Sequence, residues 1–115
     1  MKKIYYLSSC TTCTRIIKEL GIDDTWEKQD IKTENITLSQ IEEMQKLTGS
    51  YESLFSRRAM KYKSLGLKDK NLSENDYKNY ILEEYTFLKR PLIFINDKIF
   101  VGNSKKTIEA AIAEL

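Results

Sequence analysis

The sequence contains no histidine, and this absence removes several kinds of catalytic site. Many serine and cysteine enzymes activate their nucleophile with an imidazole base, so a Ser-His or Cys-His pair is excluded. Only two cysteines are present, Cys10 and Cys13. A tetrahedral zinc site needs about four Cys, His or carboxylate ligands. Acidic side chains or a second subunit would have to complete such a site here, so we expect no metal centre.

Long apolar runs and an excess of one charge are also missing. The longest apolar run, Leu92 to Ile95, is far shorter than the roughly 20 residues that cross a bilayer. The basic start Met1-Lys2-Lys3 is not followed by the long apolar region of a signal peptide. The net charge of +2 comes from 19 basic and 17 acidic residues, a balance that argues against a dedicated nucleic-acid binder. We therefore expect a cytoplasmic protein with no membrane segment and no direct, sequence-specific DNA binding.

The first third of the chain predicts a strand, a helix and a second strand. Lys3–Leu7 is rich in aromatic and branched residues, which is typical of a strand. The following helix is expected to end at Gly21. Its apolar positions are Cys13, Ile16, Ile17 and Leu20. A weaker strand is expected at about Thr25–Gln29, with Trp26 as its buried residue.

The middle of the chain predicts helices. Thr37 and Gln40 have the spacing of a capping box, and the helix that they open should run to about Leu47 and stop before Gly49. A short helical piece is expected at about Arg58–Leu65. Both of these segments are therefore expected to be helical.

A longer helix and a hairpin follow. Ser73 and Asp76 repeat the capping spacing, so the helix is expected to begin after Ser73. Its inward positions are expected to be Tyr77, Tyr80, Ile81, Glu84 or Tyr85, and Leu88. Leu92–Ile95 and Lys98–Val101 flank Asn96-Asp97, which predicts a β-hairpin. Ser104 should cap a terminal helix. The inward positions of this helix are expected to be Ile108, Ala111, Ile112 and Leu115.

The order strand, helix, strand, helices, hairpin, helix predicts an α/β fold of thioredoxin-like (glutaredoxin-like) type with a mixed sheet. The stretch at about 37–88 is a helical insertion in that order. No linker or low-complexity run interrupts residues 1–115, so we expect a single domain. Few features indicate an obligate interface, and a monomer is therefore the expected state.

Cys10-Thr11-Thr12-Cys13 lies where the first strand gives way to the helix. A thiolate at a helix start faces unpaired N–H groups and the positive end of the dipole, which lowers its pKa. Sulfurs three residues apart can also reach bridging distance there. Cys13 shares the apolar face and should be buried, whereas Cys10 should be accessible. We expect Cys10 to attack an oxidised substrate and Cys13 to resolve the resulting mixed disulfide or adduct.

Two other interpretations of the cysteines remain open. In the first, Cys13 is simply a small core residue and only Cys10 reacts. In the other the two cysteines form a structural disulfide, which a cytoplasmic location disfavours. The position between a strand and a helix favours the redox interpretation.

The only proline, Pro91, opens the predicted hairpin directly after a helix. In thioredoxin-like proteins a cis-proline at this position lies beside the dithiol and presents its backbone to the substrate. The alternative is a helix stop followed by an edge strand. Arg90, Arg57 and Arg58 could stabilise a thiolate or bind an oxyanion, although most arginines lie in solvent or pair with surface acids.

Several motifs, taken in their order, resemble the ArsC/Spx superfamily, which includes glutaredoxin-coupled arsenate reductases and the Spx transcription regulators. These motifs are Ser8-Ser9-Cys10-Thr11-Thr12-Cys13, Ser56-Arg57-Arg58-Ala59, Tyr62-Lys63-Ser64-Leu65-Gly66-Leu67, Leu88-Lys89-Arg90-Pro91-Leu92-Ile93 and Lys98-Ile99-Phe100-Val101-Gly102. The resemblance covers essentially the whole chain. It implies a thioredoxin-like sheet with a helical insertion.

The resemblance to arsenate reductases is incomplete at the oxyanion site. Such enzymes carry a catalytic cysteine at the position of Cys10 and three arginines that hold the oxyanion. Arg90 matches the second arginine, but Ser56 stands at the first position and Gly102 at the third. These departures argue against arsenate reduction.

The Spx-like branch is similar in its CxxC, in an arginine at Arg58 and in Gly102. The resemblance implies that the dithiol is a redox switch and that the protein binds the RNA polymerase α subunit. The resemblance implies that the polymerase contact uses a glycine in the insertion, and Gly49 lies near that place. Gly49 can equally be a helix stop.

Three functions are therefore considered. The preferred one is a thiol-disulfide oxidoreductase of arsenate reductase (ArsC)-like type, with no bound cofactor and with glutathione, glutaredoxin or thioredoxin as external reductant. The second is an Spx-like, redox-switched transcription regulator that binds the RNA polymerase α subunit. The third is a binding or structural domain in which the CxxC is incidental.

Overall fold

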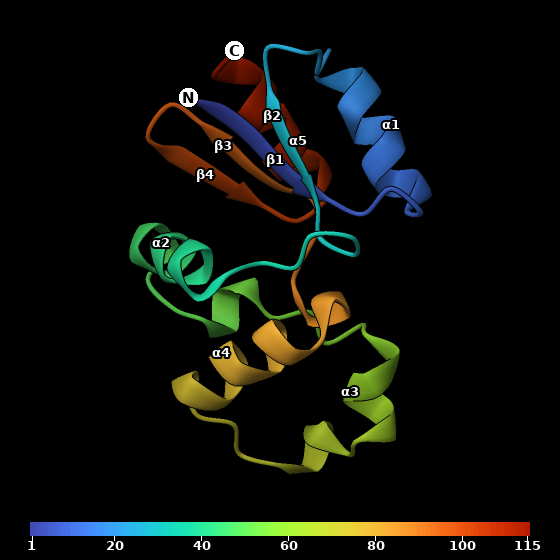
Figure 1. Ribbon diagram of the computed structural model, residues 1–115, viewed down its shortest axis with the longest axis vertical. Helices are drawn as coiled ribbons and strands as arrows, with labels where there is room; N and C mark the ends of the chain where they lie inside the picture. The colour runs from blue at the N-terminus through green and yellow to red at the C-terminus, as the bar shows by residue number, and fades with distance from the viewer. The chain divides into compact units, whose positions relative to one another are not determined.

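The computed structural model describes residues 1–115, and the chain forms two compact units (Figure 1). The first unit consists of Met1–Asn35 together with Arg90–Leu115, and the second is Ile36–Lys89. None of the helices has the length and apolar composition that crossing a membrane requires. The single-domain organisation stays a prediction.

The first unit holds a four-stranded sheet in the order β2-β1-β3-β4. The strands are β1 (Lys2–Tyr6), β2 (Glu27–Asp30), β3 (Leu92–Ile95) and β4 (Lys98–Val101). β1 pairs with β2 in parallel, whereas the β1–β3 and β3–β4 pairs are antiparallel. The predicted mixed sheet is therefore confirmed.

The hairpin of β3 and β4 has the predicted bounds. Ile95 pairs with Lys98 across the two-residue turn, and Asn96 adopts a left-handed conformation with φ of 58°. Asparagine tolerates this conformation better than most residues, which explains its place in the turn. All four residues of β3 are buried, because this strand lies between β1 and β4.

Helices α1 (Thr11–Glu19) and α5 (Lys105–Ala113) share an apolar core with the sheet. Its buried members are Ile4, Ile16, Leu20, Trp26, Ile93, Ile95, Ile108 and Ala111. The predicted inward face of α5 is correct for Ile108 and Ala111 and wrong for the last two positions. Ile112 is 44% exposed because it lines a surface groove beside α1, and Leu115, which follows the end of the helix, is 50% exposed.

The second strand starts later than predicted. Trp26 is buried as expected, but its N–H donates to the Asp23 carbonyl oxygen at 3.1 Å, which places it in a turn. β2 therefore begins at Glu27 rather than at Thr25. The Trp26 side chain is buried although its backbone lies in a turn. A buried aromatic residue next to a strand has the same sequence pattern as one within the strand.

In the second unit, α2 (Leu38–Thr48) has the predicted capping box. The Thr37 hydroxyl accepts a hydrogen bond from the Gln40 N–H, and the Gln40 side chain accepts one from the Thr37 N–H. The helix ends at Gly49, whose φ of 92° only glycine adopts easily. The helix-stop interpretation of this glycine is thus confirmed.

The remaining helices are shorter than predicted. α3 (Met60–Ser64) begins two residues after Arg58. α4 (Glu74–Glu83) has the predicted Ser73–Asp76 capping box, but it stops at Glu84, where φ is −138°. The unit also contains the 3₁₀ turns η1, η2 and η3 at Glu52–Leu54, Leu67–Asp69 and Tyr85–Phe87.

An aromatic cluster forms the centre of the second unit. The Phe55 ring stacks on Phe87 at 4.9 Å and meets the edges of Tyr77 at 4.9 Å and Tyr62 at 6.0 Å. Phe55 is fully buried and forms an isolated antiparallel bridge with Leu88. The segment around Phe55 therefore joins α4 and its following turn into one packed unit.

Candidate functional site

The turn between β1 and α1 presents the two cysteines. The Cys10 N–H donates to the Leu7 carbonyl oxygen at 3.0 Å, which closes a turn through Ser8 and Ser9. Cys10 is the N-cap residue of α1, with extended φ and ψ. Both thiols are free; Cys10 is half-buried and Cys13 is fully buried. The predicted difference in burial is confirmed.

The surroundings of Cys10 favour its thiolate. Burial by itself would raise the pKa of Cys10, but hydrogen bonds from the Cys13 N–H, the Cys13 thiol and the Thr12 N–H, together with the charge of Arg90, hold it below its ordinary value. The neutral thiol makes no capping hydrogen bond. Because thiolate sulfur is the stronger acceptor, these donors stabilise the ionised form.

The pKa of Cys13 is shifted in the opposite direction. Burial raises the pKa of Cys13 to about 11. A hydrogen bond from the Leu7 backbone opposes this rise in pKa. The hydrogen bond to Cys10 and the negative charge there, each a weaker effect, raise the pKa further, and the charge of Arg90 lowers it slightly. The pair is therefore one accessible sulfur that ionises more readily than an ordinary thiol and one buried sulfur that keeps its proton at neutral pH.

Arg90 and Pro91 lie at the same edge of the sheet as the dithiol. Tyr5 of β1 pairs with Leu92 of β3, so Pro91 stands at the end of β1 from which the chain continues to Cys10. The Arg90–Pro91 peptide bond is cis. The Gly102 N–H donates to the Pro91 carbonyl oxygen at 2.9 Å. Because β3 is a central strand, the alternative of a helix stop before an edge strand is wrong.

Arg57 and Arg58 belong to the second unit and are exposed. The Arg57 guanidinium donates to the Glu52 carboxylate at 2.7 Å and to the Tyr77 hydroxyl at 3.1 Å. Its charge therefore has a partner within its own unit. The expected contribution of Arg57 and Arg58 to the dithiol stays a prediction.

Sequence reasoning did not single out Asp30, at the end of β2. Its carboxylate accepts hydrogen bonds from the hydroxyl and the N–H of Ser8, two residues before Cys10. The signal was present in principle, because neighbouring parallel strands end at the same edge of a sheet. The pairing of β1 with β2 had to be known to use it.

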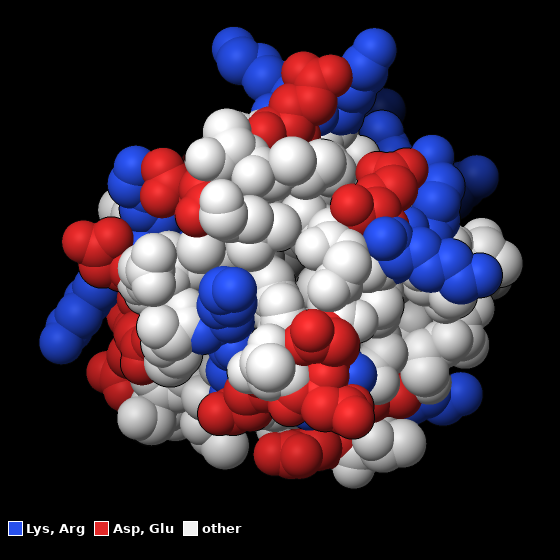
Figure 2. Space-filling view, turned by 90° about the horizontal axis from the view of Figure 1, so that it is seen from above, with Lys and Arg blue, Asp and Glu red and all other residues white.

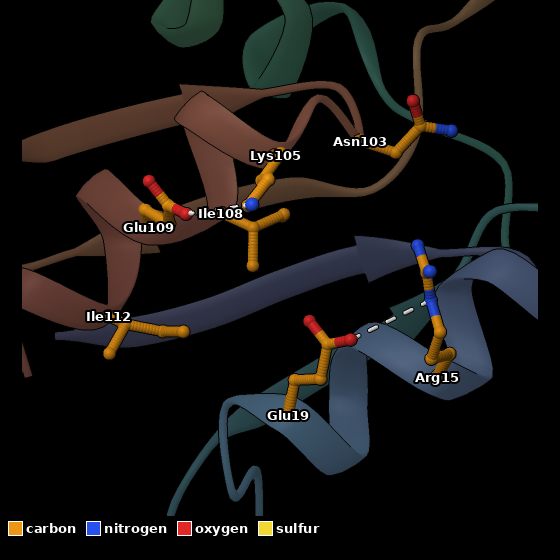
Figure 3. A pocket seen from close by; sticks show the side chains of 7 residues that line it. All are labelled: Arg15, Glu19, Asn103, Lys105, Ile108, Glu109 and Ile112. Atoms are coloured by element: carbon orange, nitrogen blue, oxygen red, sulfur yellow. Dashed lines mark ion pairs between the residues drawn. The ribbon is translucent and has the colours of Figure 1, made fainter.

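A surface groove elsewhere in the first unit has no connection with the dithiol. It lies between α1 and α5 and encloses about 350 Å³ (Figure 3). Its walls carry the ion pairs Arg15–Glu19 and Lys105–Glu109, and no cysteine lines it. Figure 2 shows both signs of charge on the face seen from above. Nowhere do three or more Cys, Asp or Glu side chains converge in a way that could hold a metal ion.

The family of the chain follows from a match over nearly all of its length. Residues 5–111 match the family model described as the ArsC family. The chain belongs to the ArsC family. The predicted membership of the ArsC/Spx superfamily is confirmed.

This ArsC family chain is similar to named proteins of two kinds. It is 26% identical over 110 residues to the global transcriptional regulator Spx of Staphylococcus aureus, covering 94% of this chain and 84% of that protein. It is 25% identical over 107 residues to Spx of Lactiplantibacillus plantarum, covering 91% and 81%. A solved structure described as a possible arsenate reductase from Streptococcus mutans has 27% identity and a TM-score of 0.74, covering 96% and 97%. The thioredoxin-like α/β fold is thereby confirmed.

Arg90 provides a direct test of the electrostatics at this ArsC-family dithiol. The variant Arg90→Ala removes a positive charge that lowers the pKa of Cys10. We expect alkylation of Cys10 at pH 7 to slow by about two- to fivefold, a fraction of a pKa unit, and Arg90→Lys to stay near wild type. The measurement is the rate of iodoacetamide labelling at Cys10 across pH. Arg15→Ala removes an exposed arginine paired with Glu19 and should change nothing; an equal effect of both alanine variants would contradict the assignment.

Proposed function

We propose that this ArsC-family protein is a thiol-disulfide oxidoreductase in which Cys10 is the nucleophile and Cys13 is the resolving thiol. The observation that supports this most is the opposite displacement of two thiol pKa values within one helical turn. The pKa of Cys10 lies below its ordinary value, whereas the pKa of Cys13 is about 11. Only the thiolate attacks a disulfide, so this difference supports Cys10 as the attacking thiol and Cys13 as the resolving one.

The proposed reaction proceeds by two exchanges. The Cys10 thiolate attacks one sulfur of a substrate disulfide, the S–S bond breaks, and the other substrate sulfur leaves as a thiolate. Cys13 then loses its proton and attacks Cys10, which releases the second substrate thiolate and leaves a Cys10–Cys13 disulfide. The substrate gains two electrons and takes up two protons. Glutathione, glutaredoxin or thioredoxin is the proposed source of the electrons that restore the dithiol.

Arg90 and Pro91 have proposed roles beside this dithiol. The positive charge of Arg90 acts on both sulfurs, and we assign it the stabilisation of the attacking thiolate. The backbone at Pro91 is the proposed contact for the substrate. Ser56 and Gly102 stand where arsenate reductases carry two of three arginines, so a disulfide is preferred over arsenate as the substrate.

The test is multiple-turnover reduction of a disulfide by the reduced protein. We expect turnover of a glutathione mixed disulfide when glutathione and glutaredoxin, or thioredoxin and its reductase, are supplied. Mass analysis after a single oxidation should find one Cys10–Cys13 disulfide. Arsenate serves as a parallel substrate and is expected to give no turnover. A protein that neither turns over nor forms the disulfide is not an oxidoreductase.

A second function has its own support, because the relatives from Staphylococcus aureus and Lactiplantibacillus plantarum are named global transcriptional regulators. In this alternative the Cys10–Cys13 disulfide is a signal, and the protein binds the RNA polymerase α subunit. The discriminating experiment is retention of purified α subunit by reduced and oxidised protein. Redox-dependent retention without catalytic turnover would favour the regulator.

A further inference from the structure

We infer that Asp30 is a positioning residue for the Cys10 thiolate. The inference deepens the proposed function, since it rests on the assignment of Cys10 as the nucleophile. Asp30 does not need to contact a substrate for this role. It holds the turn that carries Cys10 to the start of α1.

The first step of the argument is the position of Asp30 at the end of its strand. β1 and β2 are parallel, and their final residues Tyr6 and Asp30 are paired. The Ile31 N–H still donates to the Tyr6 carbonyl oxygen at 2.9 Å. Beyond this bond the two segments separate: the one after β1 leads to Cys10, and the one after β2 enters the following loop. Asp30 therefore stands at the last point where the strands are joined.

The second step is what the carboxylate binds. The Ser8 hydroxyl and N–H both donate to it, and the Lys32 N–H donates to its Oδ1 at 3.1 Å. The carboxylate thus links the segment after β1 to the segment after β2. Hydrogen bonds to an ionised acceptor are the stronger kind, and the bond from the Ser8 hydroxyl is the main reason that the pKa of Asp30 lies below its ordinary value.

The third step connects Ser8 with the sulfur. Ser8 is the second residue of the turn that the Cys10 N–H closes on the Leu7 carbonyl oxygen. The Cys10 thiolate depends on the N–H groups of Thr12 and Cys13, and such bonds weaken steeply when they are misaligned. A turn released from Asp30 would let the N-cap residue shift and would misalign these donors.

The role of Asp30 is geometric rather than electrostatic. Its negative charge would disfavour a nearby thiolate, so charge alone would make its removal lower the pKa of Cys10. Loss of alignment acts in the opposite direction and raises that pKa. The sign of the change in an Asp30 variant therefore distinguishes the two effects.

The anchor is itself held in place. The Asp30 carbonyl oxygen accepts the Glu34 N–H at 2.8 Å and the Thr33 hydroxyl at 3.3 Å. The loop after β2 is therefore tied to the same residue that holds the cysteine turn. These hydrogen bonds fix the backbone of Asp30 and so hold its side chain in place, which a positioning residue requires.

The experiment is the pH profile of iodoacetamide labelling at Cys10 in the full chain, read by peptide mass. We expect Asp30→Ala to move the midpoint to higher pH and to slow labelling at pH 7 by about three- to tenfold, which is a half to one pKa unit. Asp30→Asn keeps an oxygen acceptor without the charge and is expected to stay within about twofold of wild type by the same conversion. An unchanged or lowered midpoint in Asp30→Ala would overturn the inference.

The chain offers a matched control. Asp23 accepts the Thr25 N–H at 2.9 Å in the same kind of local turn as Asp30 and Lys32, but it follows the C-terminal end of α1, whereas Cys10 caps the N-terminal end. Asp23→Ala should leave the Cys10 profile unchanged. A shift equal to that of Asp30→Ala would mean that any lost turn has this effect, and it would overturn the inference.

A second variant keeps the inference testable if Asp30→Ala does not fold. Ser8→Ala removes the hydroxyl donor and leaves the carboxylate in place, so it should shift the Cys10 midpoint in the same direction by a smaller amount. An unchanged profile in Ser8→Ala would overturn the inference. Labelling of Cys10 needs no turnover, so absence of turnover in wild type would refute the proposed function and leave this measurement intact.

Discussion

Cys10→Ser is expected to slow alkylation of the protein at pH 7 by at least about 30-fold and to abolish disulfide formation. The only remaining thiol is then Cys13, whose pKa is about 11. Such a thiol is ionised to about one part in 10⁴ at pH 7, against about 3% for an ordinary cysteine. Loss of the Cys10 charge lowers the pKa of Cys13 somewhat, and about one unit of relief still leaves a difference of about 30-fold.

The measurement is the pH dependence of alkylation in the two single variants. In Cys10→Ser the rate should stay low until well above pH 9, because ionisation of Cys13 lags behind that of a free thiol. Cys13→Ser is the matched control, and it should be labelled as fast as wild type at pH 7. After reaction with a disulfide it should also accumulate a mixed disulfide at Cys10. Rapid labelling of Cys13 at pH 7 in the Cys10→Ser variant would contradict the assigned roles.

Phe55→Ala is expected to lower the free energy of unfolding of the second unit by about 3–5 kcal/mol, the usual effect of removing a buried phenylalanine. Phe55 is fully buried, and its ring contacts the rings of Phe87, Tyr77 and Tyr62. The substitution leaves a cavity at the centre of this cluster, which the surrounding rings can fill only in part. Ring–ring contacts add to the loss from burial alone.

The check is denaturant unfolding followed by far-ultraviolet circular dichroism. Phe55→Ala should lower the midpoint strongly. Met60→Ala is the control in the same unit, because its side chain is 89% exposed and exposed substitutions usually change stability by less than about 0.5 kcal/mol. The only tryptophan, Trp26, is buried in the first unit, so its fluorescence reports the other unit. An unchanged circular dichroism midpoint in Phe55→Ala would contradict the assigned role of the cluster.

Local signals in the sequence were sufficient for most elements. The capping boxes that begin at Thr37 and Ser73 have the predicted hydrogen bonds. The Asn96-Asp97 turn has the predicted hairpin, and Cys13 is buried on the face that its spacing indicated. In each case a few neighbouring residues determine the outcome, so a sequence pattern is enough.

The errors arise where apolar spacing continues past the end of an element. Phe87 and Leu88 are buried, but they follow α4 in a 3₁₀ turn and an extended segment. A helical pattern therefore overestimated the length of α4. Ile112 of α5 has helical spacing with Ile108 but is 44% exposed. Spacing assigns a face to a helix, but Ile112 borders the groove between α1 and α5 and therefore stays exposed.

The contact of Asp30, the residue that we propose positions Cys10, depends on strand pairing. Asp30 is 20 positions from Cys10 by its number in the sequence, and only the parallel pairing of β1 with β2 brings it to Ser8. The dithiol itself needed only its own four residues and the elements on either side of them. Contacts between distant segments require topology, which composition and spacing do not supply.

The donors around Cys10 also bias the direction of electron flow. Oxidation to the disulfide cancels the charge that the Thr12 and Cys13 N–H groups stabilise, so the protein loses these favourable contacts each time it is oxidised. A dithiol that is stabilised in this way has a disulfide that accepts electrons more readily than an ordinary one. The resting protein should therefore be reduced in a reducing compartment, and its oxidised form should persist only while an oxidant is supplied.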